Sequence, residues 1–345
     1  MDPIGASPDT ATWWRDFGRL EASGESPLLA RWCAEVARDR QVLALVDRLP
    51  WRRRQPNLVV AAARLLGAPD EPYPAFRAWL VAHWPAVEAV ALARTTQTNE
   101  AGRCATLLPV LAELDGPLAL LEVGASAGLC LVPDRYAYRY TTPTRVVVLE
   151  PAVSTVPTVP TVPNVNTLPT VPRVELPCRV DDDRLVPTHV PRVVWRAGID
   201  LSPLDVRDPD DVAWLEALVW PGADDRVRRL RAAARVVAAD PPTIVRGDLL
   251  DRLVLTAAAA PRDATLVVLH TAVLAYVDAA VRDAFTAAVR DLGAVWVSNE
   301  GQRVLPAVSA RLPPGVDTGG RFVLARDGVP RALTHPHGTA MSAVP

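Results

Sequence analysis

The stretch Leu118–Leu129, LALLEVGASAGL, constrains the fold of this chain more than any other. Its first half is a near-continuous apolar run, which is typical of a strand buried on both faces of a parallel sheet. The run ends in Glu122 and passes into a turn of small residues, with Gly124, Ser126 and Gly128 at alternate positions. Two kinds of site use such a turn: a glycine-rich cofactor loop, and a nucleophile elbow with Ser126 as the nucleophile.

Composition excludes several classes of protein. The chain has 345 residues and a formal charge of −2, which gives no global field for nucleic acid or an anionic membrane. It contains no Lys, so a Schiff-base lysine and a P-loop lysine are both excluded. Its four cysteines are scattered without a C-x-x-C pair, so we expect no metal site and no disulfide framework. We find no signal peptide at the N-terminus and no apolar run long enough for a membrane span, and therefore expect a soluble, cytoplasmic protein.

The pattern of apolar residues predicts two regions. Residues 1–114 are predicted to form an N-terminal helical region, because apolar residues recur there at helical spacing. Residues 115–345 alternate strands and helices and end in a hairpin around Asp327 and Gly328, which predicts an α/β domain with a mostly parallel sheet. An insertion at about 136–190 contains a Thr-Val-Pro repeat, for which we expect an extended, exposed loop.

Polar residues follow the predicted strands. Ligands of a parallel α/β sheet bind beyond the carboxyl ends of its strands, so the residues at those ends are the informative ones. They are Glu122 to Gly128, Asp200, Asp248, His270 with Thr271, and Asn299 with Glu300. A further polar run, which includes Asn99, Glu100 and Arg103, comes just before the central strand.

These strand ends resemble those of a class I S-adenosylmethionine (SAM) dependent methyltransferase. Glu122-x-Gly124-x-Ser126-x-Gly128 is similar to the first motif of that Rossmann-like fold, with Ser126 in place of the middle glycine. The resemblance implies that this loop passes the methionine part of SAM, that Asp200 accepts hydrogen bonds from the ribose hydroxyls, and that Asp248 faces the adenine amino group. The cofactor-binding residues that it implies are Glu122, Gly124, Ser126, Gly128, Asp200, Leu201, Asp248 and Leu249.

More narrowly, the chain resembles the bacterial domain-of-unknown-function 2332 family. The segments that carry this resemblance are TQTNEAGRCATLLPVL, LLEVGASAGL, WRAGIDLSPLDV, WLEALVWP, RGDLLD, LHTAVLAY and WVSNEG. This resemblance implies a methyltransferase-like fold without an established reaction. Cys130 departs from the pattern, since Asn is expected after the glycine loop.

The resemblance predicts a SAM-binding protein that acts as a methyltransferase. The lack of a basic patch favours a small molecule or protein over nucleic acid as the substrate, of which we expect a small molecule, and we expect no membrane partner. Methyl transfer needs an aligned nucleophile, in some cases a base, and exclusion of water. From their placement, His270, Glu100 and Glu300 are the candidate bases. Asn99 and Arg103 are candidates for orienting the substrate or the methionine end of SAM.

Three other interpretations remain. Gly124 to Gly128 also matches the G-x-S-x-G elbow of an α/β hydrolase, with His270 or His335 completing a triad. The helical region before Leu118 and the carboxylates at the strand ends favour the cofactor loop instead. A dinucleotide-binding oxidoreductase would need Gly at position 126 and an acidic residue about 20 residues further on. A non-catalytic member that binds SAM, or serves as an interaction module, is the third interpretation, in which Asp200 and Asp248 are helix caps and His270 is a core residue.

Overall fold

The computed structural model describes residues 9–97, 99–152 and 173–345. The chain divides into two compact units, one of Met1–Thr98 with Asp208–Arg228 and one of Asn99–Arg207 with Arg229–Pro345. The sequence-based boundary is residue 114, whereas the second unit of the structure begins at Asn99. The helix just before the central strand therefore groups with the sheet. The Thr-Val-Pro repeat lies outside the described residues.

The first unit is helical. Its elements are α1 (Thr10–Phe17), the π-helical η1 (Gly18–Ala22), α2 (Pro27–Val36), α3 (Arg40–Val46), the 3-10 helix η2 (Trp51–Arg53), α4 (Pro56–Leu65), α5 (Tyr73–Ala93), α7 (Pro209–Leu218) and the start of α8 (Asp224–Ala239). Side-chain caps begin several helices, as Asp9 does for α1 and Ser26 for α2. The core contains the stacked rings of Trp32 and Phe76, whose centroids are 4.0 Å apart.

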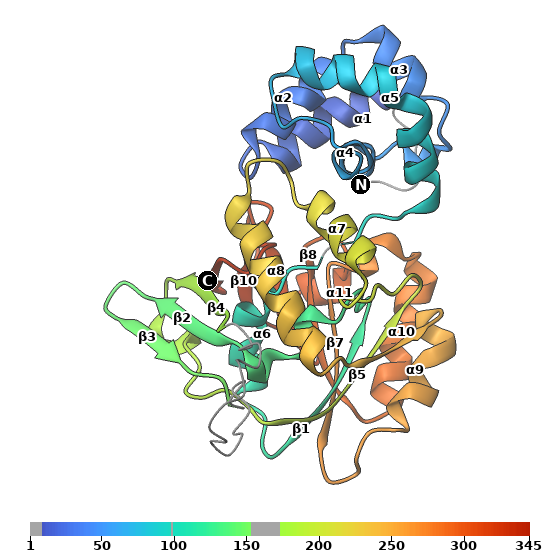
Figure 1. The fold of residues 1–345 in the computed structure, drawn as a ribbon. Helices are drawn as coiled ribbons and strands as arrows, with labels where there is room; N and C mark the ends of the chain where they lie inside the picture. Colours follow the sequence, from blue (N-terminus) through green and yellow to red (C-terminus); the bar gives the residue numbers. More distant parts are fainter. Residues whose placement is uncertain (1–8, 98, 153–172) are drawn as a thin grey trace, which may run out of the picture. The chain divides into compact units, whose positions relative to one another are not determined.

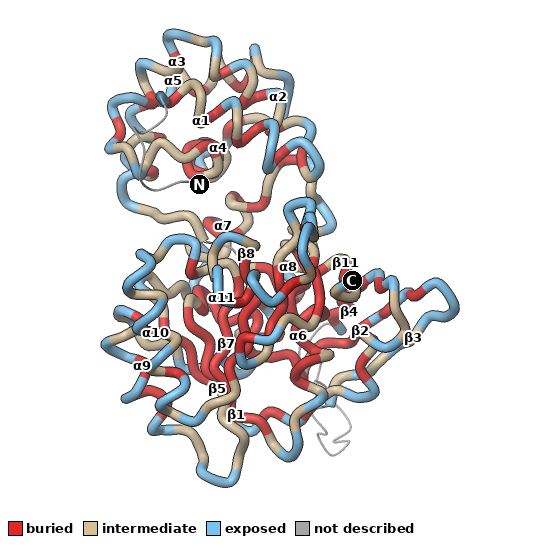
Figure 2. Tube along the Cα trace, turned by 180° about the vertical axis from the view of Figure 1, so that it is seen from behind, coloured by how far each residue is buried: buried red, intermediate tan, exposed pale blue. Residues whose placement is uncertain are grey.

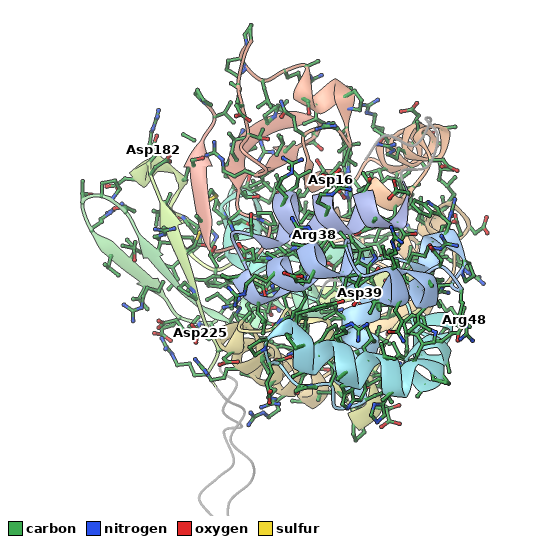
Figure 3. All side chains as sticks on the ribbon, turned by 90° about the horizontal axis from the view of Figure 1, so that it is seen from above. Asp16, Arg38, Asp39, Arg48, Asp182 and Asp225 are labelled. Atoms are coloured by element: carbon green, nitrogen blue, oxygen red, sulfur yellow. The ribbon has the colours of Figure 1, made fainter. Side chains whose placement is uncertain are left out.

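Several charged residues of this helical unit are exposed. Asp16, Arg38 and Arg48 extend from the helices and the turns between them in Figure 3. Among the described residues, no helix combines the length and the apolar character that a membrane span requires.

The second unit is built on one 11-stranded sheet, with strand order β3-β2-β4-β11-β10-β9-β8-β7-β1-β5-β6. Its strands are β1 (Leu118–Val123), β2 (Ala137–Thr141), β3 (Val146–Leu149), β4 (Glu175–Val180), β5 (Val193–Asp200), β6 (Thr243–Arg246), β7 (Thr265–Thr271), β8 (Val295–Gly301), β9 (Phe322–Arg326), β10 (Val329–Thr334) and β11 (Ala340–Ala343). The five strands from β8 to β6 are all parallel, whereas β9 and β10 form the predicted antiparallel hairpin. The prediction of an α/β fold with a mostly parallel sheet is therefore confirmed.

Helices cover both faces of the sheet. The remaining elements are α6 (Arg103–Leu111), α9 (Leu249–Ala257), α10 (Ala279–Asp291), α11 (Pro306–Ser309) and the 3-10 helices η3 (Leu129–Leu131), η4 (Pro133–Arg135), η5 (Asp183–Leu185) and η6 (Leu274–Tyr276). Helices α9 and α10 pack side by side against one face (Figure 1), where Leu121, Val268 and Phe285 belong to a common core. The opposite face carries α6, which packs against β4 and β9. The central strands are almost continuously buried (Figure 2).

The insertion between β1 and β5 extends the sheet. Strand β2 pairs with β3 and β4, and β4 pairs with the C-terminal β11. Three fully buried tyrosines in β2 and just before it anchor the strand. Tyr136, just before the strand, donates to the Leu129 carbonyl, Tyr138 to the Pro133 carbonyl and Tyr140 to the Ala105 carbonyl in α6. The insertion thus fixes both the segment after β1 and helix α6.

Candidate functional site

The turn after β1 has an alternating left-handed backbone. The φ angles are 72° at Gly124, 49° at Ser126 and 74° at Gly128. Glycine adopts this conformation at little cost, whereas Ser126 is strained in it. A Cβ atom at Gly124 would lie 2.3 Å from Cγ2 of Val273, so packing as well as conformation requires glycine there.

Asp200 and Asn99 hold this turn in place. One Asp200 carboxylate oxygen accepts the Ser126 backbone N–H at 2.8 Å, and the other accepts the Ser202 N–H at 2.7 Å. Asn99 accepts the Ala127 N–H at 3.0 Å and donates to the Ser126 hydroxyl. The structure therefore brings three sequence-predicted residues, Asn99, Ser126 and Asp200, into direct contact at the carboxyl ends of β1 and β5.

Glu122 is a buried acid beside this turn. It alternates with Leu121 and Val123 of the α9–α10 core, so it lies on the face of the sheet that carries α6. Burial raises the pKa of the Glu122 carboxyl well above its usual value, and the nearby Cys130 and Asp200 add to the rise, whereas Arg103 opposes it. Its Oε2 atom is buried and has no hydrogen-bond partner in the described part of the chain.

Arg103 begins α6 and is only 3% exposed. Its Nε donates to the Pro336 carbonyl at 2.8 Å, and its Nη1 donates to the carbonyl and hydroxyl of Thr271 at 3.0 and 3.1 Å. The Phe322 ring centroid lies 5.8 Å from Cζ. Within the described residues no hydrogen bond uses Nη2, and no ion pair joins Arg103 to Glu122, although the two charges influence each other.

His270 and Glu300 lie on the opposite face, near α10. The indole of Trp296 donates to Nε2 of His270 at 3.0 Å, so Nδ1 carries the proton that is donated to Oε1 of Glu300 at 2.7 Å. The same Glu300 oxygen accepts the N–H groups of Val273 and Leu274 at 2.9 and 3.0 Å. His270 is fully buried with both ring nitrogens bonded, so the pair supports the turn after β7 and does not face Glu122.

The other sequence-predicted residues differ in burial and in the contacts that they make. Glu100 is buried, and its Oε1 accepts Arg229 Nε at 2.9 Å and the Gly102 N–H at 3.1 Å. Asp248 is exposed and caps α9 through the Leu250 N–H at 2.8 Å. Leu249, the first residue of α9, is buried in the hydrophobic core, whereas Leu201 is 69% exposed.

Sequence reasoning missed two groups of residues at this site. Phe322 and Pro336 contact Arg103 from more than 200 positions further along the chain, and no local pattern signals such a contact. Cys104 and Cys130 lie close together, although their spacing matches no cysteine motif. Among the described residues, no group of three or more His, Cys, Asp or Glu side chains could hold a metal ion.

Comparison with protein families gives one match. A family model described as an uncharacterized protein conserved in bacteria (DUF2332) matches residues 11–342. The match spans nearly the whole chain, so the chain belongs to this family. No curated protein matches the chain, and no solved structure does.

Proposed function

We propose that this member of the bacterial DUF2332 family binds SAM and transfers its methyl group to a small molecule. The parallel strands β6-β5-β1-β7-β8 reverse their order between β1 and β7, which is the position at which open α/β sheets bind ligands. In the proposal this part of the sheet is a Rossmann-like methyltransferase core, and the small-residue turn after β1 lies against the cofactor.

The pair of Glu122 and Arg103 carries the proposal. Both side chains are buried, one is acidic and the other basic, and no ion pair joins them within the described part of the chain. A buried carboxyl with an unpartnered oxygen costs about 1–3 kcal/mol, so it calls for a compensating group. The methionine end of SAM carries an ammonium for Glu122 and a carboxylate for the remaining donor of Arg103.

The nucleoside part of SAM fits the neighbouring strand ends. Each Asp200 oxygen accepts one backbone N–H, and a carboxylate oxygen can accept two hydrogen bonds, so capacity remains for ribose hydroxyls. Asp248 is exposed at the end of the next strand, β6, where the adenine would lie. Leu201, exposed between them, offers an apolar contact.

SAM supplies an electrophilic methyl group on a sulfonium, so the chain needs only to align the acceptor and exclude water. His270, Glu100 and Glu300 support the site in this proposal, because each is committed to a buried internal contact. Thr271 and Asn299, on the same face as Glu122, are the strand-end groups placed to orient the acceptor.

Calorimetric titration with SAM and with S-adenosylhomocysteine tests the cofactor assignment. Glu122→Gln removes the negative charge while keeping the shape, and we expect it to weaken binding of both ligands about 10- to 100-fold, as for a hydrogen bond to a charged group. Asp182→Ala is the control. Asp182 is also a carboxylate, but it caps η5 and pairs with Arg184, and it is not part of the proposed site. Absence of binding by folded wild-type protein would contradict the proposal.

Proton release gives an independent measurement. The pKa of Glu122 is raised in the unliganded protein, and a bound ammonium would lower it by favouring the charged carboxylate. Binding should therefore release a proton, so the observed heat should depend on the ionisation enthalpy of the buffer. The Glu122→Gln variant should lose most of this buffer dependence, whereas equal dependence in both proteins would argue against an ammonium at Glu122.

One observation favours a serine hydrolase as the second candidate. Ser126 has the positive φ that a nucleophile elbow requires. However, its hydroxyl accepts a hydrogen bond from the Asn99 side-chain amide. Both ring nitrogens of His270 are already hydrogen-bonded, so neither is available to act as the base for Ser126. Ester hydrolysis that Ser126→Ala abolishes would favour this candidate, and SAM binding without methyl loss across a broad substrate panel would favour a non-catalytic role.

A further inference from the structure

Two of the four cysteines lie close together beside the turn after β1. Cys104 is in the first turn of α6, and Cys130 is in η3. The Cys104 sulfur lies 3.8 Å from the carbonyl oxygens of both Leu129 and Cys130, and the Cys130 sulfur lies 3.6 Å from the carbonyl oxygen of Glu100, just before α6. Both are free thiols from separate elements, and each sulfur contacts the backbone at or next to the element that carries the other cysteine.

Their surroundings make the two thiols unequal. The pKa of Cys130 is lowered by its interaction with the Cys104 side chain and by the nearby Arg103 guanidinium, which together outweigh the effect of burial. The pKa of Cys104 is raised, chiefly by burial. Cys130 also retains 7% of its surface, whereas Cys104 has none exposed. Cys130 is therefore the better nucleophile, and Cys104 is the resolving thiol that can react with oxidised Cys130.

We infer that Cys104 and Cys130 form an intramolecular disulfide when the protein meets a peroxide. The Cys130 thiolate attacks one oxygen of hydrogen peroxide, the O–O bond breaks, and a sulfenic acid and hydroxide form. The Cys104 sulfur then attacks the sulfenic sulfur, the S–S bond forms, and the S–O bond breaks. The departing hydroxide takes the Cys104 proton, so two thiols and one peroxide give one disulfide and two waters.

Mass spectrometry of the full-length protein tests this without any substitution. The folded, reduced protein is treated with hydrogen peroxide, its remaining thiols are alkylated, and it is digested with trypsin. Cys104 and Cys130 fall in one tryptic peptide, 104–135, because no Arg lies between Arg103 and Arg135. We expect this peptide to lose the mass of two hydrogen atoms and to escape alkylation. Cleavage at Glu113 and Glu122 should then leave two fragments joined until a reductant is added.

The other two cysteines are internal controls. Burial raises the pKa of Cys178 to about 12 and raises that of Cys33 further, so both should remain reduced and alkylate fully after unfolding. In Cys104→Ser the sulfenic acid has no partner, and dimedone should trap it on Cys130. Alkylation of Cys104 and Cys130 after peroxide treatment, or a disulfide that appears only when the protein is unfolded in urea, would overturn the inference.

Discussion

At the scale of single residues, Glu122 combines a cost to stability with a chemical use. Its carboxyl is 4% exposed, and one oxygen has no hydrogen-bond partner in the described residues. Such a group remains protonated in the native protein well above the pH at which it ionises in the unfolded chain. Replacing it should therefore stabilise the protein while weakening the proposed function.

The stability of the wild type should fall, relative to Glu122→Gln, as the pH rises above about 4.5, the usual pKa of Glu. In that range the unfolded chain loses the Glu122 proton while the native protein retains it, so rising pH favours unfolding. The difference should grow by about 1.4 kcal/mol for each unit by which the native pKa exceeds the unfolded one. It should become constant once the pH passes the native pKa.

Urea unfolding of both proteins at a series of pH values measures this difference, because other titrating groups contribute equally to each. A difference that does not change with pH would mean that Glu122 ionises normally in the native protein.

At the scale of elements, the turn after β1 depends on the segment after β7. Gly124→Ala places a methyl group against Val273, so we expect a loss of about 1–3 kcal/mol from overpacking, in addition to about 1 kcal/mol for the left-handed backbone. Gly116→Ala is the matched control. Gly116 has nearly the same φ, 73°, but a Cβ atom there would have no neighbour within 4 Å.

Combining Gly124→Ala with Val273→Ala should restore part of the loss. Chemical denaturation should show that the double variant is more stable, by about 1 kcal/mol or more, than the sum of the two single effects predicts. Strict additivity would show that the two segments do not press on each other.

The sequence predicted some of these elements fully. Strand β1 covers the near-continuous apolar run that begins at Leu118, and Glu122 and Asp200 lie at or next to the carboxyl ends of β1 and β5, as expected. Strands β4 and β11 were not identified from the sequence. Strand β4 alternates buried and exposed residues but contains Pro177, which is unusual in a strand, and β11 has only four residues. Both are held by pairing with distant strands.

The local sequence pattern also could not show which face of the sheet each strand-end residue points to. Strand β7 continues through Thr271, so His270 is an internal strand residue that points toward α10. Consecutive residues of a strand face opposite sides of the sheet, so the exact position of the strand decides which of the two reaches the ligand face. A shift of one residue reverses that assignment. Arg103 was a candidate from its polar surroundings, but its contacts with Thr271 and Pro336 required the tertiary fold.

At the scale of the whole molecule, the helical unit is discontinuous in sequence. Helix α7 packs against α4, and Arg64 in α4 donates to the carbonyls of Ala217 and Val219. Arg94 pairs with Asp211 at 2.6 Å. Trp214 and Leu215 are buried, and each such side chain contributes roughly 1.5–3 kcal/mol. Residues from beyond position 207 are therefore part of the stability of this unit.

A fragment that ends at Gln97 should consequently fail to fold cooperatively. Circular dichroism should show reduced helicity and a broad thermal transition. The same fragment with residues 208–228 attached through a glycine-serine linker should regain a sharp one. A cooperative transition in the shorter fragment would show that α7 is dispensable.

The late position of α7 also sets an order of events on the ribosome. Arg64 is synthesised 153 residues before Ala217, the residue whose carbonyl it binds, which corresponds to roughly 8–30 s of translation. During that interval the apolar side of α4 that receives α7 has no native cover. Strands β1 and β5, which pair in parallel, are both translated before α7. The unit that is translated first can therefore be completed only after the first pair of central strands has been made.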